Sequence, residues 1–104
     1  MSQNKVLSLL SIAARGRNLV SGEYAVEGAV KAGKAFLVLI ASDVSNNTKK
    51  MFTNMCDFYE VPLVSYGTRT ELGHAIGKEF RASLAVTDEG LAKTIINKLE
   101  TQEE

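Results

Sequence analysis

Apolar residues recur at helical spacing in five parts of the chain. Val6, Leu9, Leu10 and Ala13 follow the i, i+3, i+4, i+7 pattern of one helix face. A glycine follows this stripe and is common just after a helix, so we predict that the first helix ends near Arg15. The same reasoning predicts a second helix that stops at Gly33, a third over 46–59, a short fourth that ends near Gly77 and a fifth over the stripe 91–99.

The third predicted helix carries two apolar rows on adjacent faces. We expect both rows to face a core; they are Met51, Met55 and Phe58 in one row and Phe52, Cys56 and Tyr59 in the other. Cys56 is the single cysteine, so no internal disulfide can form. Unpaired cysteines are among the most buried residues, and we predict a small core side chain here rather than a reactive thiol.

Two helix starts carry capping residues. Thr68 and Glu71 have the threonine-x-x-glutamate spacing of a capping box, in which each side chain accepts a hydrogen bond from the other residue's backbone N–H. Asp88 stands before the last apolar stripe and can accept from an N–H of the first turn. We therefore expect the fourth and fifth helices to begin at these residues.

Short apolar runs between the helices predict four strands. The run 36–41 is apolar throughout, which is typical of a strand covered on both faces. The other strands are expected at 19–20, 63–65 and 83–86. Because helices and strands alternate, helices must cover both faces of the sheet, and we predict an α/β fold with a three-layer α/β/α sandwich. The pattern does not give the strand order.

The composition is that of a folded domain. The 104 residues are 45% hydrophobic and 23% charged, and we expect one domain over residues 1–100 with a short acidic, disordered tail at 101–104. The apolar stretch near the start is broken by serines and has no convincing cleavage site, so we expect a cytoplasmic protein without an export signal. We also expect a monomer that does not associate with a membrane.

The formal net charge of zero conceals an uneven distribution. Residues 1–50 hold seven basic and three acidic residues, or +4, whereas residues 51–104 hold five basic and nine acidic residues, or −4. The basic half offers a set of cations for phosphate groups, while the acidic half favours solubility. An ordinary solvated surface explains the same charges equally well.

Four segments in this order and spacing resemble a known family of RNA-binding proteins. They are 13–23, 35–43, 72–79 and 85–88. The chain resembles a bacterial member of the superfamily of archaeal ribosomal protein L-seven-Ae, which includes eukaryotic ribosomal protein L-thirty-e and other kink-turn RNA binders. The resemblance covers residues 6–99. It implies a mixed four-stranded sheet between helical layers and RNA as the ligand. We expect no cofactor and no metal.

In RNA-binding members of that family, the second helix starts with a glycine and then an asparagine, an acid or amide, and a lysine that read purine edges. Gly22 is kept here, but the other three positions are Tyr24, Ala25 and Gly28. Glu23 and Tyr24 still offer an acceptor, a donor and a ring that can stack on a base. The alternative is that Glu23 is a first-turn acid favoured by the helix dipole and Tyr24 a partly buried ring.

The resemblance also implies an RNA contact in the loop before the last strand. There Phe80 can stack on a base and Arg81 can pair with phosphate. The alternative is that Phe80 covers the end of the sheet and Arg81 pairs with Glu79. Lys31 and Lys34 are expected to contact the RNA backbone without reading sequence.

Nothing in the chain favours an enzyme. Residues 28–35 match most of the glycine-x4-glycine-lysine motif of nucleotide-binding loops, but a helix precedes it and a strand follows it, which is the reverse of what that loop needs. His74 is the only histidine and has no second ligand at metal-binding spacing. Ser65 and Ser83 lie in predicted strands with nothing to activate them.

We therefore expect a non-catalytic protein of ribosomal type that binds structured RNA rather than DNA. The expected target is a kink-turn or an internally looped stem, with ribosomal RNA as the partner. The expected RNA-binding residues are Gly22, Glu23, Tyr24, Lys31, Lys34, Phe80 and Arg81. The alternative is a protein-interaction module on the same fold that has lost kink-turn specificity.

Overall fold

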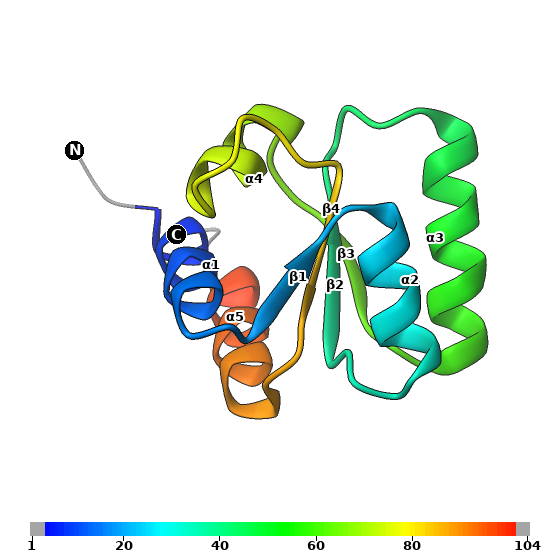
Figure 1. Cartoon of the computed structure of the whole chain (residues 1–104), viewed down its shortest axis with the longest axis horizontal. Coiled ribbons are helices and arrows are strands. Elements are labelled where there is room, and N and C mark those ends of the chain that lie inside the picture. Colours follow the sequence, from blue (N-terminus) through cyan, green and yellow to red (C-terminus); the bar gives the residue numbers. More distant parts are fainter. Residues whose placement is uncertain (1–3, 102–104) are drawn as a thin grey trace.

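The computed structural model describes residues 4–101 and contains five helices and four strands within them (Figure 1). The elements alternate as the sequence predicts. In chain order they are α1 (Lys5–Arg15), β1 (Leu19–Ser21), α2 (Glu23–Lys31), β2 (Leu37–Ile40), α3 (Asn46–Tyr59), β3 (Leu63–Ser65), α4 (Arg69–Ala75), β4 (Ser83–Val86) and α5 (Glu89–Thr101).

The four strands form one mixed sheet in the order β1-β4-β2-β3. Strand β4 is antiparallel to both neighbours, with Ala85 opposite Val20 in β1 and Val38 in β2. Strands β2 and β3 are parallel, with Val38 opposite Leu63. Because β2 and β4 are central and covered on both faces, all four residues of each are buried, as the apolar run 36–41 predicts for β2. Phe36, at the start of that run, lies before β2 and is exposed.

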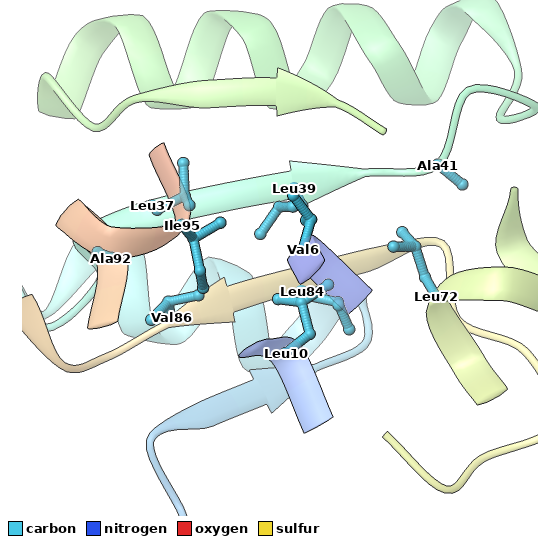
Figure 2. Packing of buried hydrophobic residues seen from close by; sticks show 10 residues of the cluster. All are labelled: Val6, Leu10, Leu37, Leu39, Ala41, Leu72, Leu84, Val86, Ala92 and Ile95. Carbon is cyan, nitrogen blue, oxygen red and sulfur yellow. The ribbon is translucent and has the colours of Figure 1, made fainter. Parts of the chain in front are cut away.

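Helices cover both faces of this sheet, which confirms the three-layer sandwich (Figure 1). Successive side chains of a strand point to opposite faces, so each central strand supplies both cores. Figure 2 shows the core under α1, α4 and α5, where Leu10, Leu72 and Ile95 pack with Leu39 and Leu84. The second core lies under α2 and α3 and contains Val26, Val30, Val38, Ile40, Phe52, Cys56 and Ala85. Within residues 4–101, no helix combines the length and the apolar character needed to cross a membrane.

The predicted capping residues are confirmed. The side chain of Thr68 accepts from the Glu71 N–H over 3.1 Å, and the Glu71 carboxylate accepts from the Thr68 N–H over 2.9 Å. The Asp88 carboxylate accepts from the Leu91 N–H over 2.9 Å at the start of α5. Thr101, which was predicted to belong to the tail, ends α5 instead, and residues 102–104 lie outside the described part of the chain.

One prediction about α3 is wrong. Phe52 and Cys56 are buried as expected, but Phe58 is 78% exposed and Tyr59 is 39% exposed. Helix α3 contacts β3, at the edge of the sheet, and α2 beside it. Met51 and Met55 are partly buried and pack against the core, so each apolar row reaches the core except at its last residue. The Phe58 and Tyr59 rings instead contact each other edge to face, with their centroids 4.9 Å apart.

Candidate nucleic-acid interface

The start of α2 forms one side of a rim at the upper end of the sheet (Figure 1). Strand β1 ends at Ser21, and Gly22 turns the chain into α2 with a φ of +94°. Residues that carry a side chain rarely adopt a φ in this range, so the turn favours glycine. The Gly22 N–H donates to the Ser83 carbonyl over 3.0 Å, which attaches the turn to β4.

The first turn of α2 is open on its outer side. Gly22 has no side chain with which to cap the helix, and Tyr24 is 91% exposed. Glu23 is also exposed. The first N–H groups of a helix have no partner inside the helix and carry partial positive charge, so they favour an electronegative ligand. Because Tyr24 is so exposed, the alternative that its ring is partly buried is excluded.

The loop before β4 forms the opposite side of the rim, and hydrogen bonds hold the Arg81 side chain in it. Its Nε donates to the Ser21 hydroxyl over 3.0 Å, and Nη1 donates to the Phe80 carbonyl over 2.9 Å. Its backbone N–H donates to the Arg69 carbonyl over 3.0 Å. Among residues 4–101 the ion pairs do not include one between Arg81 and Glu79, so that alternative is wrong.

A close backbone contact holds this loop against α4. A Cβ atom placed on Gly73 would lie 2.3 Å from the Phe80 Cα, so glycine is required for the two backbones to approach. The Lys78 N–H donates to the Gly73 carbonyl over 2.8 Å and reinforces the contact. The Phe80 side chain is still 53% exposed, which leaves about half of it open to a ligand.

Between the two sides of the rim lies a pocket of about 220 Å³. It is bounded by the starts of α2 and α3, the start of α4 and the residues that lead into β4. The side chains that line it are those of Glu23, Val44, Ser45, Thr48, Phe52, Arg69, Ala82 and Ser83. The pocket thus combines an apolar floor with hydroxyl groups, one carboxylate and one guanidinium.

Two of these polar residues were not recognised from the sequence. Ser83 is fully buried, and its hydroxyl has no hydrogen-bond partner among the residues that the structure describes. Its only signal is that it is a serine at the start of an otherwise apolar strand. Arg69 is exposed at the rim, where its backbone N–H donates to Asp43 Oδ1 over 3.0 Å and its Nε lies 3.5 Å from Asp43 Oδ2. In the sequence, Arg69 lies between the capping residues Thr68 and Glu71, and only its helix start was recognised.

The predicted basic contacts Lys31 and Lys34 do not lie at this rim. They lie at and just after the far end of α2, about 13 Å from its start for a helix of nine residues. The Lys31 ammonium is 2.7 Å from the Glu27 carboxylate, and this hydrogen bond raises the pKa of Lys31.

The rim carries both signs of charge. Its cations are Arg69, Lys78 and Arg81, and its acids include Glu23 and Asp43. All three cations come from the acidic half of the chain, because α4 and the loop before β4 form the rim. Of these three cations, only Arg81 was predicted from the sequence as an RNA contact.

Comparison with known proteins gives one family and several close relatives. Residues 4–96 match the ribosomal protein L7Ae/L30e/S12e/Gadd45 family. The RNA-binding protein YlxQ of Bacillus subtilis (strain 168) is 42% identical over 100 residues, covering 96% of this chain and 100% of YlxQ. RNA-binding protein YlxQ of Enterococcus faecium is 33% identical over 92 residues, covering 88% of each chain.

Two solved structures share the fold. A protein of unknown function from Bacillus halodurans C superposes with a TM-score of 0.91 at 39% identity, covering 94% of this chain and 99% of that one. The Giardia lamblia 15.5kD RNA binding protein superposes with a TM-score of 0.78 at 22% identity, covering 97% of this chain and 92% of that one. The second likeness shows the fold alone.

Proposed function

Since this chain belongs to the ribosomal protein L7Ae/L30e/S12e/Gadd45 family, we propose that it is a non-catalytic RNA-binding protein that recognises a kink-turn or internally looped stem. The family membership confirms the resemblance inferred from the sequence. The names of the two YlxQ relatives support RNA as the ligand. The observation that carries the proposal is the pocket between the start of α2 and the loop before β4, because it joins the two elements in which the sequence predicts RNA contacts.

The start of α2 reads the stem through Glu23 and Tyr24. The Glu23 carboxylate accepts from base amino groups, and the exposed Tyr24 ring stacks on a base or donates its hydroxyl proton. The first-turn N–H groups face phosphate or base acceptors. Tyr24, Ala25 and Gly28 replace the polar residues of the family pattern, so the readout depends on this pair of side chains and on the shape of the RNA.

The pocket receives one unstacked base of a bent RNA. Its apolar floor accommodates the base face, while the Arg69 guanidinium at its edge and the Ser83 hydroxyl buried beneath it offer hydrogen-bond partners. The half-exposed Phe80 ring at the rim can stack on a neighbouring base, and the remaining N–H groups of Arg81 can bind a phosphate. A bound base would give the buried Ser83 hydroxyl the partner that the described residues do not supply.

The proposal is tested by titrating the protein with a kink-turn stem and with the same stem carrying broken G·A pairs, at low and moderate salt. We expect tighter binding to the intact stem and a loss of affinity for both stems as salt rises. Equal and weak binding to both stems would exclude kink-turn recognition. The absence of salt-sensitive binding to either stem would favour the protein-interaction module instead.

Point variants locate the reading surface. Arg81→Ala should weaken binding to both stems, whereas Glu23→Ala and Tyr24→Ala should reduce the preference for the intact stem by about 1 to 3 kcal/mol each. Lys34→Ala removes an exposed lysine at the far end of α2 and is the matched control, so it should leave the preference unchanged. A preference that survives both α2 variants would place the reading surface elsewhere.

The variant Ser83→Ala distinguishes an effect on RNA binding in the pocket from an effect on the stability of the fold. Removal of an unsatisfied buried hydroxyl should leave the free energy of unfolding equal or raise it by about 1 kcal/mol, while RNA affinity falls. Sequencing of the RNA that co-purifies with the protein from cells then tests whether ribosomal RNA is the target.

A further inference from the structure

The outer edge of β3 is an unused pairing edge in the described part of the chain. In the order β1-β4-β2-β3, β3 pairs with β2 alone. The Val38 N–H donates to the Pro62 carbonyl, and the Tyr66 N–H donates to the Ile40 carbonyl, each over 2.9 Å. Because pairing direction alternates along a strand, Leu63 and Ser65 point their N–H and C=O groups away from β2.

A groove of about 390 Å³ follows this edge between β3 and α3. Val61, Leu63 and Ser65 line its strand side. Lys49, Thr53 and Asp57 line its helix side. An edge that offers backbone hydrogen bonds beside a groove for alternate side chains is suited to a further extended strand.

The groove has one positive and one negative end. Strands β2 and β3 are parallel and α3 connects them, so α3 runs in the opposite direction to β3 (Figure 1). Lys49, in the first turn of α3, therefore lies towards the Ser65 end of the groove. Asp57, about 12 Å further along the helix, lies towards the Val61 end.

The β3 edge and the groove of one copy complement those of a second copy. We propose that two copies of this protein pair through β3 across a two-fold axis. The axis passes beside Val64, and the two β3 strands run antiparallel. Leu63 then faces Ser65 of the partner subunit, and the reciprocal pair is equivalent, which gives four backbone hydrogen bonds. The two four-stranded sheets become one continuous sheet of eight strands.

The charges of Lys49 and Asp57 favour a second copy of this protein as the partner over an unrelated peptide. An antiparallel two-fold arrangement places the Lys49 end of each groove beside the Asp57 end of the other, so the same two residues form two cross-subunit pairs. The Leu63 side chain of each copy enters the groove beside Ser65 of the partner subunit. Strand β3 itself contains no lysine or proline of the kind that blocks pairing at natural sheet edges.

This dimer uses other residues than the candidate RNA interface. None of the residues that line the pocket at the rim also lines the groove between β3 and α3. The inference does not rest on the proposed function, and it replaces the expectation of a monomer.

Sedimentation velocity of the full chain over a wide concentration range tests the proposal. The wild type should show a concentration-dependent monomer–dimer equilibrium. Lys49→Asp and Asp57→Lys should each weaken dimerisation by about tenfold, because each turns two attractive pairs into repulsive ones. The double variant Lys49→Asp with Asp57→Lys should restore the wild-type affinity, since the opposite signs face each other again.

Two further variants keep the test specific. Lys50→Asp changes the same charge one residue along α3, outside the groove lining, and should leave dimerisation nearly unchanged. Ser65→Pro removes an outward N–H without touching the ladder to β2, and should abolish dimerisation while circular dichroism shows a folded chain. A wild type that stays monomeric at every concentration, or a dimer that tolerates both single charge reversals, would overturn the proposal.

Discussion

Arg81 and Ser21 are 60 positions apart in the sequence, yet the Arg81 Nε donates to the Ser21 hydroxyl over 3.0 Å. The bond joins the loop before β4 to the last residue of β1. Gly22 follows directly and starts the turn into α2. This partly buried hydrogen bond from a charged group therefore joins the two halves of the candidate RNA interface, in addition to the backbone bond from the Gly22 N–H to the Ser83 carbonyl.

Ser21→Ala should uncouple these two halves. We expect a loss of about 1 kcal/mol in the free energy of unfolding, because the partner is charged and the bond is partly buried. Arg81 should then sample more positions, and RNA affinity should fall roughly fivefold. Urea denaturation and fluorescence anisotropy measure the two effects.

Thr94→Ala is the control for that variant. Its hydroxyl donates to the Gly90 carbonyl within α5, away from the rim, so RNA affinity should not change. If Ser21→Ala also left RNA affinity unchanged, Arg81 would not need its hydrogen bond in order to act.

Gly73→Ala should displace the loop that carries Phe80. The new Cβ would meet the Phe80 backbone at 2.3 Å, and neither backbone can move without breaking the contact between α4 and the loop. We expect a loss of about 2 to 4 kcal/mol in urea denaturation, as for severe overpacking. Gly28→Ala is the matched control in α2, where no atom lies within 4 Å, and it should stabilise by about 0.5 to 1 kcal/mol.

Phe52→Ala and Phe58→Ala should differ strongly although both lie in α3. Phe52 is fully buried, and its truncation should reduce the free energy of unfolding by about 3 to 5 kcal/mol. Phe58 is 78% exposed and loses only its edge contact with Tyr59, so its truncation should reduce stability by less than about 1 kcal/mol. Similar losses for both variants would mean that the Phe58 ring is buried in solution.

Cys56 should react slowly with thiol reagents in the native protein. Burial raises the pKa of the Cys56 thiol above its usual value, so less of the reactive thiolate is present at pH 8 than in a free peptide. We expect alkylation at least about a hundredfold slower than for a peptide thiol, with its pH dependence shifted to higher pH. Urea should accelerate the reaction in step with unfolding. Reaction at the peptide rate would show that the groove beside β3 opens to Cys56.

Local rules in the sequence determined most of the fold. Capping by Thr68 and Asp88 depends on residues three apart, and strand 83–86 and helix 46–59 follow from apolar runs and spacing. Burial of Cys56 followed from its residue type and apolar neighbours. These features could be predicted because each depends on residues that are close together in the chain.

The tertiary structure alone decided which faces are covered and which residues meet. The sequence pattern made both apolar rows of α3 equivalent, but the place of α3 at the sheet edge left Phe58 exposed. The sequence grouped Lys31 with Arg81 as expected RNA contacts, yet the tertiary structure put Arg69 and Arg81 near the first turn of α2 and left Lys31 at its far end. Strand pairing joins segments that are distant along the chain, and periodicity within each segment carries no information about its partner.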